Sequence, residues 1–382
     1  MKKTLFILGI VLFAIPSYPA DLLTAYKTGE IKLVPDSSFG AKTAWDMMFK
    51  ATFDKQMAFL QDGSFFKTAY ADAVVYRFDA GGAKIAEFGR RMGQGPGDLN
   101  GPVRFDILDG KSLVIYEEGN KRLSQFGLDG QFIKIFKVES QGVSASEPVV
   151  TLTALGNGKI AVVSKDRTST FWIKRFRVII KDLQTGVETE IASFVDEKPQ
   201  SPIFIKDERF DGSVHLARSG SDRLLVGYSK SPEIAFFSFD GKKISSFNIE
   251  AEKVAVAFEH LEFVMKPDPK DLKATEGYQK VIVGNRDKIR LPEFHPFYQG
   301  LGVDPDGRIV LVLNNLAKKT KDIFWQIYSP EGKSLATVKL DPGEFEIIHP
   351  YVVNIHGNSL YTMLARPDAD GTQFLARIKI AD

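Results

Sequence analysis

A unit of about fifty residues recurs along the chain, and a repeat of this length constrains the fold more than any single motif does. Each unit contains a short apolar strand, a first turn, an alternating strand, a loop, a second alternating strand, a second turn ending in Gly, and a final strand. The first turns lie at Asp62-Gly63, Asp109-Gly110, Asn157-Gly158, Ser221-Asp222, Asp306-Gly307 and Gly357-Asn358. Such residues supply the positive φ of tight hairpins, so the chain is predicted to be all-β.

The second turn and the alternation of apolar residues define the fold more closely. Second turns lie at Gly81-Gly82, Asp129-Gly130, Thr185-Gly186, Asp240-Gly241 and Glu331-Gly332. Leu113 and Ile115 alternate with their neighbours, as half-buried strands require. Six units of three or four strands around an axis predict a six-bladed β-propeller. Seven blades is the alternative if a long interval in the repeat contains a further blade.

Two segments lie outside the regular repeat. One, at about residues 250–293, is interpreted as an insertion within a single domain, because it is too short to bury a core of its own. The other is Glu30–Val34, a lone strand-like segment before the first unit. The sixth unit lacks its outermost strand, so residues 30–34 are predicted to pair with the last blade and close the ring, which would hide two exposed sheet edges.

The first twenty residues have the pattern of a secretory signal peptide. Lys2 and Lys3 form a basic start and Leu5–Ile15 an apolar run that is too short to span a bilayer. Cleavage is expected after Ala20, which leaves residues 21–382 as one domain without a membrane span, periplasmic or secreted from a bacterium. An uncleaved anchor is the alternative.

Charge and cysteine content exclude several classes of protein. The chain has 50 Lys plus Arg and 48 Asp plus Glu, and loss of the two lysines in the signal peptide would make it formally neutral. A neutral surface provides no general attraction to nucleic acid, so none is expected as a partner. The absence of cysteine excludes disulfides, cysteine nucleophiles and cysteine-based zinc or iron–sulfur sites.

Two segments resemble a known family. Residues 113–136 closely resemble an NHL repeat, with Asn120 and Arg122 at the Asn-x-Arg positions and Glu117 where Asp is usual. Residues 93–99, Gly-Gln-Gly-Pro-Gly-Asp-Leu, are similar to the connection between NHL blades. The chain is thereby similar to the bacterial extracytoplasmic six-bladed propellers of the NHL-repeat or TolB-like group. The resemblance implies fold and compartment far more than activity.

The same two segments have alternative interpretations. Residues 93–97 would suit a phosphate-binding loop only if a helix followed, and the Asn100-Gly101-Pro102 that follows predicts a crossover between blades instead. Glu117 and Glu118 would suit a carboxylate pair for metal or acid–base chemistry. The favoured interpretation is structural, with Asn120 and Arg122 bonded to the backbone of a tight loop.

Three of the five histidines precede or begin predicted inner strands: His215, His295 and His349. Inner strands converge on a propeller axis, so these imidazoles would form a zinc site if they met there. The favoured interpretation is that the repeated His-Pro at 295 and 349 is a turn before the strand, and no cofactor is expected. Zinc held by the histidines, or calcium held by carboxylate and Asn groups, is the alternative.

The predicted function is binding at the axial funnel of the propeller, by inner strands and the 250–293 insertion. The ligand would be a peptide, a glycan fragment or an envelope partner. The candidate binding residues are Arg104, His215, His295, Gln299, His349, Tyr351 and Asn354. No catalytic residue is assigned, because the sequence has no nucleophile elbow or His-Glu-x-x-His motif. The alternatives are a metal-dependent lactonase- or lyase-type enzyme using the histidines, and a non-catalytic scaffold that uses its outer blade faces.

Overall fold

A computed structural model describes residues 21–40, 57–69, 72–90, 92–137, 148–166, 169–170, 172–201, 208–267, 271–366 and 373–381, and the structural statements below concern these residues. The predicted signal peptide, residues 1–20, lies outside them. None of the helices in this part of the chain is both long and apolar enough to cross a membrane.

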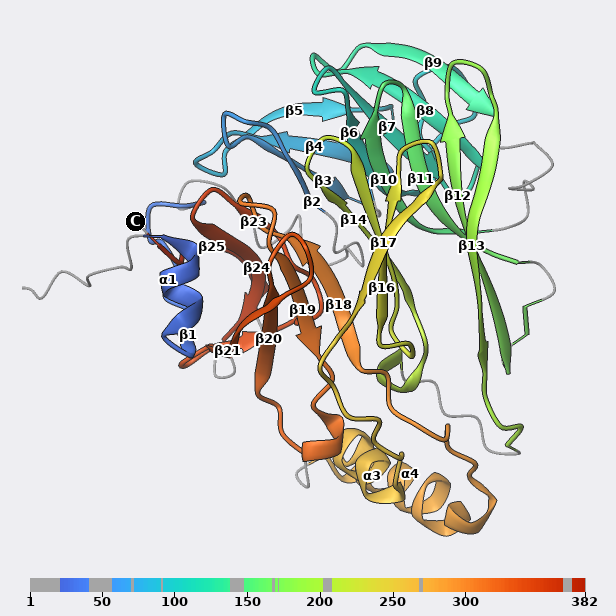
Figure 1. The fold of residues 1–382 in the computed structure, drawn as a ribbon, viewed down its shortest axis with the longest axis vertical. Helices are drawn as coiled ribbons and strands as arrows, with labels where there is room; N and C mark the ends of the chain where they lie inside the picture. Colours follow the sequence, from blue (N-terminus) through green and yellow to red (C-terminus); the bar gives the residue numbers. More distant parts are fainter. Residues whose placement is uncertain are drawn as a thin grey trace, which may run out of the picture.

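Six sheets stand in a ring, one for each predicted unit (Figure 1). Blade 1 contains β2 (Met57–Phe59), β3 (Phe65–Ala69), β4 (Val74–Phe78) and β5 (Lys84–Phe88). Blade 2 contains β6 (Pro102–Leu108), β7 (Ser112–Glu117), β8 (Arg122–Gly127) and β9 (Phe132–Lys137). Blade 3 contains β10 (Val149–Gly156), β11 (Lys159–Lys165), β12 (Ile173–Asp182) and β13 (Glu188–Glu197).

The second half of the ring repeats this plan. Blade 4 contains β14 (Val214–Ser219), β15 (Arg223–Tyr228), β16 (Glu233–Ser238) and β17 (Lys243–Asn248). Blade 5 contains β18 (Tyr298–Val303), β19 (Ile309–Leu313), β20 (Ile323–Tyr328) and β21 (Ser334–Asp341). Blade 6 contains β22 (Glu346–Ile347), β23 (Ile355–His356), β24 (Ser359–Ala365) and β25 (Gln373–Lys379). The six-bladed prediction is confirmed, and the seven-bladed alternative is wrong.

The core lies between neighbouring blades, and phenylalanine fills much of it. Between blades 1 and 2, the rings of Phe66 and Phe88 meet edge to face at 5.3 Å, and Phe126 approaches Phe88 at 6.4 Å. Burying each such ring contributes roughly 2–3 kcal/mol. Phenylalanine thus serves inter-blade packing among the described residues, as sheets that meet face to face require.

The N-terminal strand closes the ring in a different way from the prediction. β1 (Glu30–Lys32) pairs in parallel with β21, so that it becomes the fifth strand of blade 5. Main-chain pairing with the last blade begins only at Pro35, which bridges Ile378 on β25, and Asp36 forms an ion pair with Arg377 at 2.6 Å. The predicted pairing of residues 30–34 with the last blade is therefore wrong. The unpaired edge of blade 5 was the better partner, because residues 30–33 bury Ile31 and Leu33 there.

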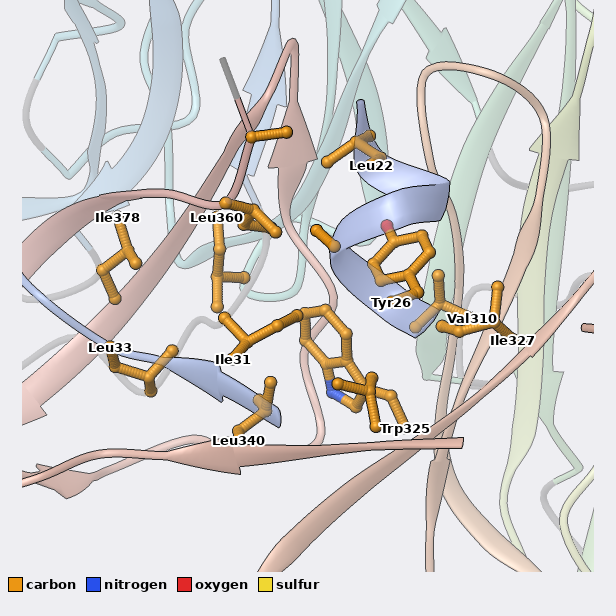
Figure 2. Packing of buried hydrophobic residues seen from close by; sticks show 14 of the residues in the cluster. Leu22, Tyr26, Ile31, Leu33, Val310, Trp325, Ile327, Leu340, Leu360 and Ile378 are labelled. Atoms are coloured by element: carbon orange, nitrogen blue, oxygen red, sulfur yellow. The ribbon is translucent and has the colours of Figure 1, made fainter. Parts of the chain in front are cut away.

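A short helix, α1 (Leu22–Lys27), precedes β1 and packs on the same two blades. Figure 2 shows Tyr26 and Ile31 beside Trp325 of blade 5, with Leu360 of blade 6 nearby. Tyr26 is completely buried, and its hydroxyl donates to Asp304 Oδ2 at 3.3 Å. Burial, followed by the charge of Asp304, raises the pKa of Tyr26 far above its usual value. Residues 22–33 therefore act as a strap across the joint between the last two blades.

The loop between blades 1 and 2 is the predicted crossover. It connects β5 to β6, and its Gly93, Gly95 and Asp98 amides donate within the loop itself. Arg122 donates to the carbonyls of Gln94, Gly95 and Asp98 and to Glu117 Oε1, and Asn120 donates to the Gly93 carbonyl. The structural interpretation of the Asn-x-Arg motif is confirmed.

The insertion between blades 4 and 5 is helical. It contains α3 (Phe258–Met265), α4 (Leu272–Val281) and the 3-10 segment η3 (Val283–Lys288), which extend away from the sheets in Figure 1. Its buried residues Leu261, Ile282 and Ile289 pack with Phe210 and Leu316 of the propeller. The apolar residues of the insertion thus form a small cluster of their own, completed by two residues from 3-10 turns that precede blade 4 and interrupt blade 5.

Candidate functional site

A cavity of about 450 Å³ opens where the inner strands begin, and we call it the axial cavity. Its walls come from blades 2 to 6, because every inner strand starts at this end of the ring. The lining residues are Arg104, Val150, Thr151, Lys174, Phe176, Arg209, Asp211, Gly212, Ser213, Val214, His215, Tyr298, Gln299, Tyr351 and Val352. Its volume is that of a small-molecule site.

The seven candidate residues fall into three separate places. Arg104, His215, Gln299 and Tyr351 line the axial cavity. His349 and Asn354 line a small depression between blades 6 and 1, and His295 lines a neighbouring cavity of about 290 Å³. None of the described residues of the 250–293 insertion lines the axial cavity. The structure therefore brings together four of the seven.

The three histidines of the zinc hypothesis do not converge. His215 Nε2 is 2.8 Å from Ser213 Oγ, whereas His295 Nε2 is 2.8 Å from His260 Nδ1 on α3. His349 lies in the separate depression. The described part of the chain contains no group of three or more His, Asp or Glu side chains placed to hold a metal ion. The geometric assumption of that hypothesis is wrong.

A cluster of charged side chains that the sequence did not reveal forms one wall of the axial cavity. Lys174 on β12 approaches Asp211 Oδ2 at 2.5 Å, and Lys198 contacts the other carboxylate oxygen from behind the wall. Burial lowers the pKa of Lys198, which Asp211 partly offsets. Burial, followed by the charge of Lys174, lowers the pKa of Lys165. Lys165, Lys174 and Lys198 thus lie close together around Asp211.

Lys174 and Phe176 reach the cavity because the outer two strands of blade 3 are long. β12 and β13 have 10 residues each, longer than the strands of the other blades, and they carry Lys174 and Phe176 above the ring to the cavity. The long interval between the third and fourth units was the signal in the sequence. It indicated an insertion, but not which side chains the longer strands would present.

Arg104 and Gly212 are fixed by neighbouring blades. Arg104 Nε donates to the Val150 carbonyl at 2.7 Å, which ties β6 to β10, the inner strand of the next blade. The Gly212 amide donates to Asp196 Oδ2 at 3.0 Å, and Lys230 pairs with Asp196 Oδ1. The cavity walls are therefore positioned before a ligand arrives, which reduces the entropy that binding costs.

Tyr351 reaches the cavity because the inner strand of blade 6 is interrupted. β22 and β23 both pair with β24, and residues 348–354 run between them. There the main chain of Tyr351 lies directly against Gly300 of β18, and the side chain of Val353 lies against Gly302. Glycine at both positions permits this close approach.

His215 is electrically neutral in its site. Burial lowers its pKa to about 4, so the ring is uncharged at neutral pH. Its Nε2 pairs with Ser213 Oγ. The main-chain amide of Ser213 in turn donates to Ser229 Oγ at 2.9 Å. At this pKa the imidazole is a poor base for activating the serine, because a general base works best near the operating pH.

Comparison with known proteins supports the fold class alone. No protein-family model matches this sequence, and neither does any curated protein sequence. A member of the DUF4221 family from Bacteroides vulgatus has a similar structure, with a TM-score of 0.52 and 12% identity over 92% of this chain and 98% of that one. A gluconolactonase from Xanthomonas campestris has a TM-score of 0.46 at 13% identity over 97% and 99% of the two chains. Virginiamycin B lyase from Staphylococcus aureus has a TM-score of 0.42 at 11% identity over 84% and 79%. The chain is a six-bladed β-propeller.

Proposed function

We propose that this propeller is an exported binding protein that holds a small ligand, such as a glycan fragment or a short peptide, in its axial cavity. The observation that carries the proposal is the cavity itself, about 450 Å³ in volume, with walls from five blades. Sites of this size, with aromatic side chains and a few fixed polar groups, are typical of small-molecule recognition. Export rests on the signal-peptide pattern of residues 1–20.

The state of the Ser213–His215 pair disfavours one kind of catalysis, that of a serine hydrolase which uses this pair. A serine hydrolase needs a histidine that accepts the proton of the serine hydroxyl near neutral pH. Burial holds the pKa of His215 at about 4, which opposes that transfer.

A ligand screen tests the proposal. Purified protein is mixed with small oligosaccharides and short peptides, shifts of the melting temperature identify ligands, and calorimetry measures their affinity. Gln299→Ala removes an amide from the cavity wall, and we expect it to weaken binding about tenfold, since a hydrogen bond of about 1 kcal/mol or more is lost. Asn354→Ala, an equivalent truncation outside the cavity, is the control and should leave the affinity unchanged.

Three results would contradict the proposal. Ligands whose affinity is equal in Gln299→Ala and in the unaltered protein would bind elsewhere. Chemical conversion of a ligand during incubation would favour the enzyme alternative. Capture of an envelope protein with an affinity that neither cavity substitution nor bound ligand changes would favour the scaffold.

A further inference from the structure

We propose that the His260–His295 pair is a pH-sensitive latch, whose protonation in mild acid loosens α3 and the adjoining wall of the axial cavity. Such a latch would control how firmly one wall of the cavity is held, whichever ligand binds there, and so it goes beyond the proposed function. Three features support it: the hydrogen bonds of the pair, its contact with Phe210, and the charged groups around it.

The hydrogen bonds of the pair leave no place for a further proton. His260 Nδ1 accepts from the Ala257 amide at 3.0 Å, and it lies 2.8 Å from His295 Nε2. Because the amide can only donate, His260 Nδ1 carries a lone pair and His295 Nε2 carries the proton. A proton added to His260 Nδ1 would face both donors and remove both bonds. A proton added to His295 would go to Nδ1, a buried nitrogen without a partner among the described residues.

These bonds fasten the start of α3 to the base of the insertion. Ala257 is the N-cap of α3 and its side chain makes no capping bond, so His260 Nδ1 satisfies its amide instead. At the base, the Val256 amide donates to the Glu293 carbonyl at 3.1 Å, and the His295 amide donates to the Val254 carbonyl at 3.0 Å. Protonation of the pair would therefore free α3 and leave the main-chain bonds of the base in place.

Phe210 connects the latch to the axial cavity. Its ring is buried, with its centroid 5.6 Å from that of His295, and it belongs to the apolar cluster of the insertion. Phe210 ends the 3-10 turn η2 (Glu208–Phe210), and Arg209 and residues 211–213 on either side of it line the axial cavity. Movement of α3 away from His295 would uncover Phe210 and loosen this part of the wall.

The charged groups near His260 do not compensate for an added proton. Glu259, whose charge favours protonation, is exposed and paired with Arg286 at 3.1 Å. Lys319, at the end of the 3-10 turn η4 (Leu316–Lys318), acts in the opposite sense. Burial, followed by the charge of Lys319, lowers the pKa of His260.

The same holds for the charged groups near His295. The neighbouring cavity that His295 lines also contains three carboxylates and two lysines: Asp196, Glu197, Glu293, Lys230 and Lys253. Asp196 is already paired with Lys230 at 2.5 Å. Burial, followed by the charge of His260, lowers the pKa of His295 to about 4. Both histidines therefore favour the neutral, closed latch at neutral pH.

The closed latch should become less stable as the pH falls from 6.5 towards 4. In an open latch His295 would meet water and regain its usual pKa of 6.5, so the open form binds a proton that the closed form does not. From these two values, His295 alone shifts the equilibrium towards the open form roughly eightfold between pH 7 and pH 5.5. The lowered pKa of His260 acts in the same direction.

Hydrogen–deuterium exchange of the intact protein tests the latch. Peptides are analysed by mass spectrometry after exchange at pH 7 and pH 5.5, with correction for the intrinsic rate at each pH. We expect the protection of the α3 amides to fall roughly eightfold at the lower pH. The Gly212 and Ser213 amides, which donate to side chains of Asp196 and Ser229, should lose protection with them. The amides of β15 should keep theirs, because the sheet stays closed.

A double variant keeps the hydrogen bonds and removes the titration. His260→Asn places an amide oxygen near the position of Nδ1, where it accepts from Ala257, and His295→Gln places an amide NH₂ near the position of Nε2. Protection of α3 in this variant should change by less than about twofold between the two pH values. His356→Gln is the matched control. His356 is half-buried on β23 and also has a pKa lowered by burial, and its loss should leave the response of α3 intact.

Three results would overturn the latch: equal protection of α3 at both pH values in the unaltered protein, an equal loss in α3 and β15, or a full response in the double variant. If the double variant does not fold, NMR titration of the unaltered protein decides. Ordinary pKa values for both histidines contradict the latch, and lowered values support it. A response in α3 without one at Gly212 and Ser213 refutes the connection to the cavity wall. The ligand screen remains a separate test of the proposed function.

Discussion

Gly300 on β18 lies directly against the main chain of Tyr351: a Cβ atom at Gly300 would come within 1.9 Å of the Tyr351 carbonyl oxygen. Two residues further along β18, Gly302 also has a close neighbour. A Cβ atom added there would lie 2.6 Å from the Cβ of Val353. The segment that brings Tyr351 and Val352 into the axial cavity thus packs against two glycines, and a larger residue at either position would collide with it.

Gly300→Ala should therefore displace the Tyr351 segment. The added methyl group meets main-chain atoms, which cannot rotate away, and we expect a loss of about 1–3 kcal/mol of unfolding free energy. Weaker binding in the axial cavity should accompany it. Gly277→Ala on α4 is the control, since nothing lies within 4 Å of its Cβ position, and it should be neutral or stabilising by up to about 1 kcal/mol. Urea unfolding measures both, and equal effects would contradict the expectation.

The strap formed by residues 22–33 can be tested with two equivalent leucines. Leu22 and Leu272 are each the first residue of a helix capped by an Asp, but Leu22 is 2% exposed and Leu272 is 79% exposed. Leu22→Ala should cost about 2–5 kcal/mol through lost burial and a cavity between blades 5 and 6. Leu272→Ala should change stability by less than about 0.5 kcal/mol. A small effect of Leu22→Ala would mean that the strap is not part of the cooperative fold.

Arg122 is expected to stabilise the joint between blades 1 and 2. Its guanidinium binds Glu117, which is completely buried, together with three loop carbonyls. Arg122→Ala leaves the carboxylate without its cation and should cost about 3–5 kcal/mol. Arg122→Lys should recover only part of this, because an ammonium lacks the fork geometry. Arg286→Ala, which breaks an exposed pair with Glu259, should cost less than about 1 kcal/mol, and thermal unfolding compares the three.

Stability should fall in mild acid because buried histidines resist protonation. Burial lowers the pKa of His215 and of His295 to about 4 from a usual value of 6.5, and His260 adds to the shift at His295. Between pH 6.5 and 4 the unfolded chain binds protons that the folded chain does not, so the free energy of unfolding decreases as the pH falls. Above that range these groups add no pH dependence.

The hydrogen bonds around His295 explain why its protonation would destabilise the folded state, and they suggest a substitution that tests the pH dependence. The Ala257 amide donates to His260 Nδ1, so that nitrogen accepts and His295 Nε2 donates to it. His295 Nδ1 is buried and has no partner among the described residues, so a second proton would be left unpaired there. His295→Asn should be less stable at pH 7 but lose less stability between pH 7 and pH 5, as measured by urea unfolding. An equal or larger loss in the variant would refute the assignment.

The blades were predictable because their signals are local. Gly82, Gly130 and Gly332 have φ values of 88°, 87° and 90°, a backbone conformation for which glycine is favoured, so the sequence marks each hairpin by itself. The partner of residues 30–34 was not predictable in the same way. Two unpaired edges were available, and the choice depended on how Ile31 and Leu33 fit against blade 5, a contact between residues about three hundred positions apart.

The axial cavity was only half predictable for a similar reason. Arg104, His215 and Gln299 were identified because inner strands converge on the axis. Lys174 and Asp211 were missed, since they reach the cavity through the extended strands of blade 3 and the loop before blade 4. His349 was misplaced because the interruption of the inner strand in blade 6 depends on the glycines of a different blade.

The parallel pairing of β1 with β21 also determines when, during synthesis of the chain, β1 can find its partner. Lys339, the partner of Glu30, is made about three hundred residues after it. At 5–20 residues per second that interval is roughly 15–60 s, far longer than a strand needs to form. During this period the apolar face of residues 22–33 has no partner. The nascent chain must be kept from aggregating throughout, and the ring can close only after β21 has been made.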